Sequence, residues 1–294
     1  MAPQLAALWK SQYGQDVDGV IGIDPVFLQY LLGLVGNVSL PDGTVVDGTN
    51  AAKVLMHDVY WNYPVEESDG IFASVASAAF DKILGGIGDV DVTKLVSAVE
   101  RGAEEGRLIA WMRNDDEQNA IKETGIDASL PNPDDPSADP VAGVYFNNLS
   151  FSKLDWYLNA DTQIGQGVKN GDGTCSYRIT VTLTNIMTQE EAGKLPDYVA
   201  ASAPDAARDD ERLNVSLFAP TGGNITDLTV EGTQFGLGAA TWHGIPFYSG
   251  TVDLHAGETT TITYTLTTSA EAGDKPLTLR QTPTCQAARD SASA

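Results

Sequence analysis

The densest group of side chains that could bind a ligand is a short aromatic segment in the first quarter of the chain. It consists of Tyr60, Trp61 and Tyr63, with two polar neighbours, Asp58 and Asn62. Aromatic rings stack on flat apolar surfaces such as sugar faces, and carboxylates and amides hydrogen-bond to hydroxyl groups. Asp58 and the three rings therefore predict a glycan-binding site. The alternative is that one or two rings cover the hydrophobic core while the others pack on the following loop.

Motifs for catalysis or metal binding are missing from the sequence. It contains no GxxxxGK[ST], HExxH or GxSxG motif, no EF-hand loop and no zinc-ligand spacing. His57, His243 and His255 are far apart along the chain, so sequence alone gives no reason to expect a shared metal or a nucleophile-base pair. We expect no catalytic residue, no metal site and no cofactor, and a binding role rather than an enzymatic one.

The chain has two cysteines, Cys175 and Cys285, which flank a region of strand-like patterns. Their spacing fits neither a CxxC redox motif nor a metal site. A disulfide between them is predicted, which implies an oxidising compartment; two buried thiols in a cytosolic protein are the alternative. No signal peptide or membrane-spanning run is apparent, so, if the disulfide forms, either a targeting segment has been removed or, as we favour, this is the C-terminal part of a longer exported protein, with any membrane contact made only through a segment absent from this chain.

Composition limits the classes of partner. The 294 residues include 17 Lys plus Arg and 40 Asp plus Glu, which gives a net charge of -23. Such a charge repels phosphate backbones and anionic lipid, so nucleic acid is excluded as a partner. Hydrophobic residues make up 42% and charged residues 19%, as in a folded globular protein rather than a disordered acidic chain.

The first half of the sequence predicts a mixed α/β arrangement. Residues 17–23 form a short apolar run typical of a strand, and Asp24 followed by Pro25 is a typical helix start. A single strand before several helices suggests a truncated sheet. Further helix starts are expected at Thr49 or Asn50, Ser68, Asp91 and Asn114.

The second half predicts strands. Tyr177, Ile179, Val181 and Leu183 alternate with polar residues, and similar runs follow at intervals that contain Gly, Pro and Asp. We therefore expect an α+β protein: a helix-rich α/β domain over 1–142 that ends in a Pro/Asp-rich linker at 131–140, then a β-rich domain over 143–294. Its strands over about 175–285 predict an antiparallel, immunoglobulin-like β-sandwich.

Four segments together resemble a known family. They are VDGVIGIDPVFLQYLLGLVGNVSLPDGT (17–44), TNAAKVLMHDVYWNYP (49–64), GVYFNNLSFSKLDWYL (143–158) and CSYRITVTLTN (175–185). They are similar to the actinobacterial surface proteins grouped as domain of unknown function 4012. The resemblance implies a large, N-terminally membrane-anchored cell-envelope protein, and the family offers no established activity to carry over.

Residues 17–84 also show a fainter similarity, to the second half of LytR-CpsA-Psr phosphotransferases. Those enzymes attach glycopolymers from polyprenyl pyrophosphate carriers to the cell wall and hold the pyrophosphate with arginines. Here the first arginine is Arg101, and between Gly43 and Asp91 the only Lys or Arg residues are Lys53 and Lys82. A pyrophosphate needs charge-assisted donors, so an upstream segment would have to supply them.

Three hypotheses for function follow. The first is an extracytoplasmic cell-envelope or cell-surface module without catalysis, which serves surface assembly or contacts a cell-wall glycan or another envelope protein. The second is part of a cell-wall glycopolymer transferase. The third is a glycosidase-like hydrolase that uses two acidic residues near the aromatic segment.

Overall fold

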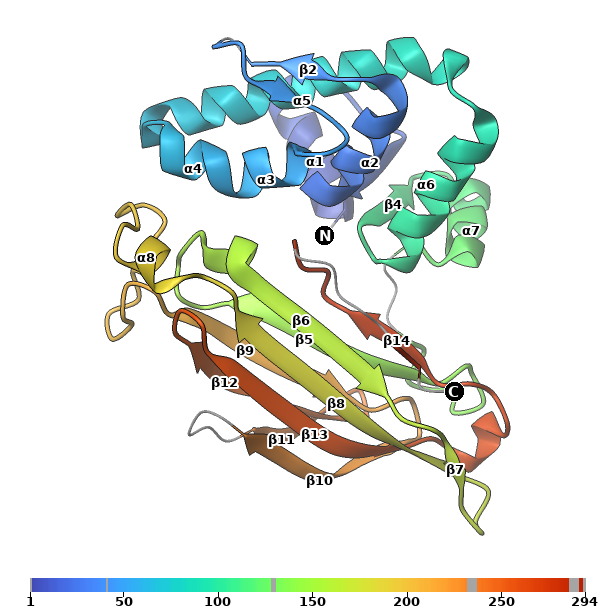
Figure 1. The fold of residues 1–294 in the computed structure, drawn as a ribbon. Helices are drawn as coiled ribbons and strands as arrows, with labels where there is room; N and C mark the ends of the chain where they lie inside the picture. The colour runs from blue at the N-terminus through green and yellow to red at the C-terminus, as the bar shows by residue number, and fades with distance from the viewer. Residues whose placement is uncertain (1, 41, 128–130, 232–236, 286–290, 293–294) are drawn as a thin grey trace. The chain divides into compact units, whose positions relative to one another are not determined.

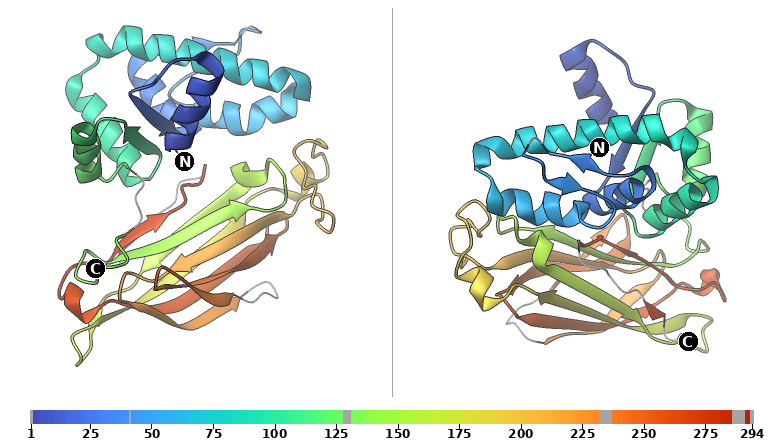
Figure 2. Two further views of the ribbon diagram at one scale, coloured as in Figure 1. Left: turned by 180° about the vertical axis from the view of Figure 1, so that it is seen from behind. Right: turned by 45° about the horizontal axis from the view of Figure 1, so that its top comes forward.

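The computed structural model describes residues 2–40, 42–127, 131–231, 237–285 and 291–292. Its contacts divide the chain into two compact units, Met1–Leu130 and Pro131–Ala294 (Figure 1). Long helices gather in the first unit and long strands in the second, as the views in Figure 2 also show. The chain therefore has an α+β fold.

A strand followed by a capped helix forms one side of the first unit. Strand β1 (Gly19–Ile23) pairs antiparallel with β4 (Leu108–Met112). Asp24 ends the strand and caps helix α2 (Pro25–Val35), because its Oδ1 accepts a hydrogen bond of 2.7 Å from the Phe27 backbone amide. The predicted change from strand to helix at this point is confirmed. The sheet has two strands within the described residues.

The other helices of the first unit enclose or flank a hydrophobic core. They are α1 (Ala2–Tyr13), α3 (Ala51–Lys53), α4 (Val59–Asn62), α5 (Val65–Gly86), α6 (Val92–Glu104) and α7 (Asp115–Thr124), with a π-helical turn η1 (Val54–Asp58) and a 3-10 turn η2 (Ile87–Asp89). The short strands β2 (Val38–Ser39) and β3 (Val45–Val46) form a hairpin. The core joins Leu32 of α2, Val46 of β3, Val59 of α4 and Val75 of α5. None of the described helices combines the length and apolarity of a membrane span.

Helix starts in this unit follow local signals, with one exception. Asp91 and Asn114 cap α6 and α7 through hydrogen bonds from backbone amides, as predicted. The predicted start at Ser68 is wrong, because α5 begins at Val65, directly after Pro64. The Ser68 hydroxyl donates to the Pro64 carbonyl at 3.4 Å and lies inside the first turn.

The second unit contains two sheets. One has the order β11-β12-β9-β5-β14 and the other β10-β13-β8-β6-β15, with β7 also paired to β8. The strands are β5 (Val141–Asn148), β6 (Leu158–Ile164), β7 (Val168–Lys169), β8 (Cys175–Asn185), β9 (Glu211–Phe218), β10 (Asn224–Glu231), β11 (Gly238–Trp242), β12 (Ile245–Leu254), β13 (Thr259–Thr267), β14 (Thr278–Gln281) and β15 (Ser291–Ala292). Short helices are η3 (Leu154–Tyr157), α8 (Gln189–Ala192) and η4 (Ala270–Ala272).

The inward-facing residues of both sheets share one core. Ile179, Val181 and Leu183 of β8 are fully buried, as the alternating pattern predicted, and they belong to one cluster with Val215 and Leu217 of β9. The core also takes in β5 and β6, so the sheets begin before residue 175.

The strand order departs from the predicted immunoglobulin-like arrangement. In immunoglobulin constant domains the first strand pairs with the second, in the order ABED on one sheet and CFG on the other. Here the first strand, β5, pairs with β9 and β14, and the second strand, β6, lies in the opposite sheet. The alternating pattern predicts which face of a strand is buried but does not determine which strand it pairs with.

The proline-rich segment 131–140, predicted as a linker, is held against the second unit. Thr221 Oγ1 donates to the Asn132 carbonyl at 3.0 Å, and Lys275 Nζ donates to the Ser137 carbonyl at 2.7 Å. These bonds join the segment to the loops that precede β10 and β14. The segment therefore packs as part of the second unit.

The predicted disulfide is not formed: Cys175 and Cys285 are both thiols in the structure. Cys175 begins β8 in one sheet, and its carbonyl accepts a bond from the Thr268 amide. Cys285 follows β14 in the other sheet, seven residues after Thr278, where that strand begins. Cys175 begins a strand of one sheet, whereas Cys285 lies beyond the end of a strand of the other, and the two sulfur atoms are not bonded. The oxidising compartment was predicted from this disulfide, so that prediction loses its support.

Candidate ligand-binding site

The aromatic segment lies on a helical run whose backbone is irregular. Helices α3 and α4 are joined by the π-helical turn Val54–Asp58. A π turn is rare, adds a residue to a helical turn, and occurs frequently at functional sites. Asp58 ends this turn, Tyr60 and Trp61 follow it, and Tyr63 terminates α4 in an extended conformation. The turn therefore sets the directions of all four predicted binding residues.

Asp58 is paired with two basic groups on its own helical run. Lys53 Nζ lies 2.7 and 3.0 Å from its two carboxylate oxygens, and His57 Nδ1 lies 2.7 Å from Oδ1. Consecutive residues of a regular helix point about 100° apart, which argues against a contact between neighbours such as His57 and Asp58. The contact is made nonetheless, within the π turn. About a quarter of the Asp58 side chain stays exposed, which leaves acceptor positions for a ligand.

The rings of Tyr60 and Trp61 have different surroundings. Tyr60 packs against Phe72 of α5, with ring centroids 5.5 Å apart. Trp61 stacks on His57 at 5.3 Å with an angle of 20° between the rings, and both residues are partly exposed. The Trp61 indole N–H is buried and has no hydrogen-bond acceptor within the described residues. Tyr60 therefore follows the packing alternative, and Trp61 retains an unused donor.

Tyr63 forms a polar cluster with the loop between β2 and β3. Its hydroxyl donates a short hydrogen bond to Asp42 Oδ2 and lies 3.4 Å from Thr44 Oγ1. The hydrogen bond to the Asp42 carboxylate raises the pKa of Tyr63, and the same bond lowers the pKa of Asp42. The negative charge of Asp58 also acts on Tyr63. Tyr63 is therefore joined to Asp42 and Thr44 of the β2–β3 loop by its hydroxyl group.

Each arginine described in the first unit is paired with a carboxylate. Arg107 is buried, with Nη1 2.6 Å from Asp24 and Nε 2.5 Å from Glu105. Arg101 binds the other oxygen of Glu105 at 2.7 Å, and Arg113 lies 3.1 Å from Asp16. Burial of Arg107 would lower its pKa, but these carboxylates raise it. Arg107 thereby links Asp24 at the start of α2 to Glu105 at the end of α6.

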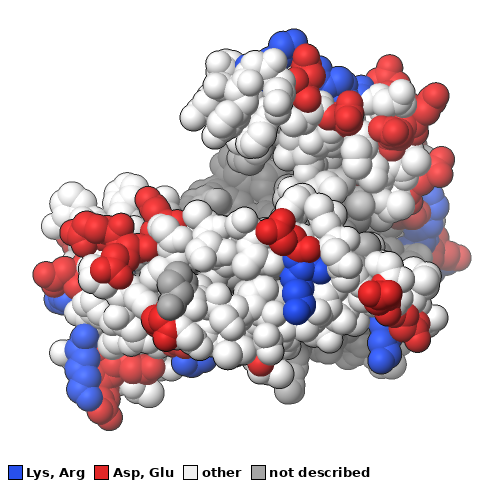
Figure 3. All heavy atoms as spheres, turned by 90° about the horizontal axis from the view of Figure 1, so that it is seen from above, with Lys and Arg blue, Asp and Glu red and all other residues white. Residues whose placement is uncertain are grey.

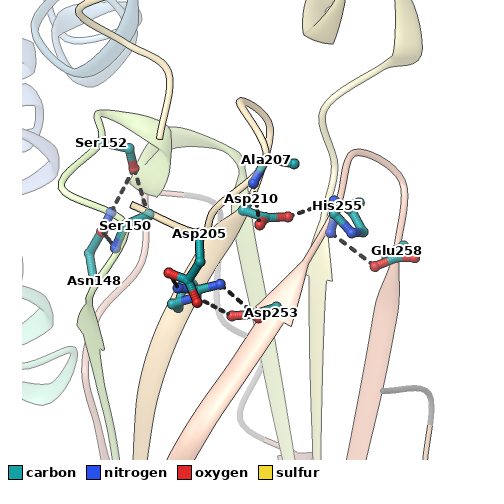
Figure 4. Close-up of polar contacts among 10 residues, drawn as sticks. Asn148, Ser150, Ser152, Asp205, Ala207, Asp210, Asp253, His255 and Glu258 are labelled. Atoms are coloured by element: carbon teal, nitrogen blue, oxygen red, sulfur yellow. Dashed lines mark hydrogen bonds and ion pairs between the residues drawn. The ribbon is translucent and has the colours of Figure 1, made fainter. Parts of the chain in front are cut away.

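A second polar group, which sequence reasoning missed, lies at one end of the sandwich (Figure 4). Asn148 Nδ2 donates to Ser152 Oγ and to Asp155 Oδ2, both at 3.1 Å, and lies 3.4 Å from Glu211 Oε1. Asn148 Oδ1 in turn accepts the Ser150 hydroxyl at 2.8 Å. Residues this far apart in sequence meet only because β5 and β9 pair, so no local spacing indicates them.

The pKa values of two carboxyl groups in this cluster, those of Glu211 and Asp155, are raised. Burial raises the pKa of Glu211 well above its usual value, and the charge of Asp155 raises it further. Burial also raises the pKa of Asp155, against the opposing effect of its hydrogen bond from Asn148. Since two close buried carboxylates resist simultaneous ionisation, the pair retains a proton more readily than exposed carboxylates do.

Comparison with known proteins relates the first part of the chain to one family. Residues 1–60 match the sequence model of a family described as a protein of unknown function, DUF4012, which supports the resemblance over that part of the chain. No curated protein matches significantly. One similar structure, a candidate nutrient-binding protein from Legionella pneumophila, has 10% identity and a TM-score of 0.24 and aligns with 45% of each chain. At that TM-score the likeness supports no conclusion about fold or function. The chain spans less than half of that structure.

Proposed function

We propose that the chain is a binding module of an extracytoplasmic cell-envelope protein, without catalysis of its own, and that Asp58, Trp61 and Tyr63 contact a glycan. The observation that carries the proposal is the π turn Val54–Asp58. An irregular helical turn lacks the regular hydrogen bonding of an α-helix, so it persists where packing or ligand binding requires it. This turn directs the Trp61–His57 stack and the Asp58 carboxylate. The envelope setting is our inference from the resemblance to the DUF4012 surface proteins, whose family model, described only as of unknown function, matches residues 1–60.

The groups present fit a neutral or amino-bearing sugar. The exposed part of the Trp61 ring would stack on an apolar sugar face. Asp58 and Asp42 would accept hydrogen bonds from hydroxyl or ammonium groups. Acidic side chains are spread over the face of the molecule shown in Figure 3, and the net charge is -23, so an anionic glycan would be repelled.

The pairing of the arginines in the first unit does not favour the transferase alternative. Binding a pyrophosphate requires guanidinium or ammonium groups that can turn towards it. Arg101, Arg107 and Arg113 are each paired with a carboxylate, and Lys53 is paired with Asp58. The non-catalytic module is therefore the proposal.

A thermal-shift screen tests this proposal. Ligand that binds only the folded state raises stability by RT ln(1 + [L]/Kd), so a neutral cell-wall glycan fraction should raise Tm and an anionic fraction should not. Trp61→Phe, which keeps a ring but a smaller one, should reduce the shift, and Trp61→Ala should abolish it.

The matched control is Trp9→Ala, because Trp9 is exposed on α1 of the same unit and packs on Tyr13. This variant should keep the full shift. A shift that survives Trp61→Ala, or no shift with any neutral glycan fraction, would reject the proposal.

A further inference from the structure

Three metal-ligating side chains meet at the end of the sandwich where β9 begins and β12 ends. Asp209 and Asp210 directly precede β9, and His255 directly follows β12. His255 Nδ1 lies 2.6 Å from Asp210 Oδ1 and 3.8 Å from Asp209 Oδ1. One ligand atom from each residue falls within 4.8 Å of the others. Figure 4 shows the Asp210 carboxylate directed at the His255 ring.

Each carboxylate is oriented by a backbone amide. Asp210 Oδ2 accepts from the Ala207 amide at 2.7 Å, and Asp209 Oδ2 accepts from the Ala256 amide at 3.0 Å. The other oxygen of each carboxylate, Oδ1, therefore faces the His255 ring. Hydrogen bonds that orient ligating side chains are a regular feature of metal sites.

Asp210 provides an independent indication of a missing ligand. Its side chain is only 5% exposed, and Oδ1 is a buried oxygen with no hydrogen bond in the described part of the chain. His255 Nδ1 lies 2.6 Å away and forms an ion pair with Oδ1 only when its ring is protonated; the contact is not a hydrogen bond in the structure. A buried carboxylate oxygen without a donor is costly. A cation between the two atoms would satisfy Oδ1 and use the Nδ1 lone pair.

A buried asparagine fixes the spacing of the two loops. Asn185, at the end of β8, is fully buried, and its Nδ2 donates to the Leu254 carbonyl at 3.0 Å and the Asp209 carbonyl at 3.2 Å. These two carbonyls belong to the segments that carry His255 and the two aspartates. The three ligands are thus set by the fold rather than by flexible surface loops.

We propose that Asp209, Asp210 and His255 bind a divalent cation, with Zn²⁺ preferred to Ca²⁺. An imidazole with two carboxylates is a set that suits zinc, whereas calcium takes six to eight oxygens. Two ligand atoms on one tetrahedral zinc lie about 3.4 Å apart, given Zn–N and Zn–O distances of about 2.0–2.2 Å. The two observed separations, 2.6 and 3.8 Å, bracket that value. Half of the His255 side chain is exposed, which gives the ion a path from solvent.

Calorimetric titration of the full, EDTA-treated chain with ZnCl₂ tests the proposal. A single saturable Zn²⁺ per chain is expected, with CaCl₂ at least tenfold weaker. His255→Gln should weaken Zn²⁺ binding tenfold or more, and Asp209→Asn should also weaken it, while circular dichroism shows both variants folded.

The matched control is His243→Gln, in the same unit, where the His243 ring packs edge-on against Trp242. It should bind Zn²⁺ as the wild type does. Absence of a saturable site, or equal affinities of His255→Gln and His243→Gln, would overturn the proposal.

Discussion

Asn185 offers the sharpest test of how the second unit is held together. Asn185 Nδ2 donates to the carbonyls of Asp209 and Leu254, and Oδ1 accepts the Met187 amide at 3.0 Å. Asn185→Ala removes these three hydrogen bonds while its own backbone bonds remain. Each buried bond contributes about 1 kcal/mol net, and an unsatisfied buried group costs about 1–3 kcal/mol. We therefore expect the free energy of unfolding to fall by about 3 kcal/mol or more.

Urea unfolding followed by circular dichroism measures this loss, with Asn214→Ala as the matched control. Asn214 lies on β9, where its side chain donates to the Ser216 hydroxyl at 3.3 Å and accepts from the Ser249 hydroxyl at 3.1 Å. Its replacement should cost less than about 1 kcal/mol. Hydrogen exchange gives a second readout, because the Met187 amide should lose protection in Asn185→Ala. Equal stability of the two variants, with Met187 still protected, would refute the reasoning.

Two further predictions concern burial in each unit. Because burial and Asp155 raise the pKa of Glu211, the folded state holds a proton that the unfolded state releases, so stability should fall as pH rises from about 4.5 through the folded-state pKa. Glu211→Gln should weaken this decline in pH-dependent urea unfolding and stabilise the protein at neutral pH; a variant less stable at neutral pH would contradict this. Gly102→Ala should lower stability by about 1–3 kcal/mol in thermal unfolding, because its Cβ would lie 2.4 Å from the Phe27 ring. Gly70→Ala, with open space around its Cβ, should be neutral or stabilising, and a similar result for Gly102→Ala would show that α6 shifts freely.

Local structure could be predicted where the signal is local. Asp24, Asp91 and Asn114 begin helices because short polar side chains satisfy the first free amides, and this depends on a few neighbouring residues. The alternation around Ile179 likewise predicted a buried strand face. Ser68 gave the same type of signal but lies inside a helix, because the preceding proline already starts it.

Features that depend on pairing between strands far apart in the sequence could not be predicted. Cys175 begins β8 of one sheet and Cys285 follows β14 of the other, and strand alternation does not determine sheet membership. The meeting of Asp209 and Asp210 with His255 depends on the same long-range order. In the first unit, the aromatic segment was found from composition, but the π turn that orients it has no sequence signature.

The most direct test of the proposed glycan contact is the indole N–H resonance of Trp61 in a ¹⁵N–¹H spectrum. The chain has five tryptophans, and loss of one peak in Trp61→Phe assigns the signal. Titration with a neutral cell-wall glycan should move the Trp61 signal, because a sugar stacked on the partly exposed ring changes the magnetic environment of the indole N–H. The Trp9 signal should stay in place. A Trp61 signal that does not move while the glycan binds elsewhere would contradict the account.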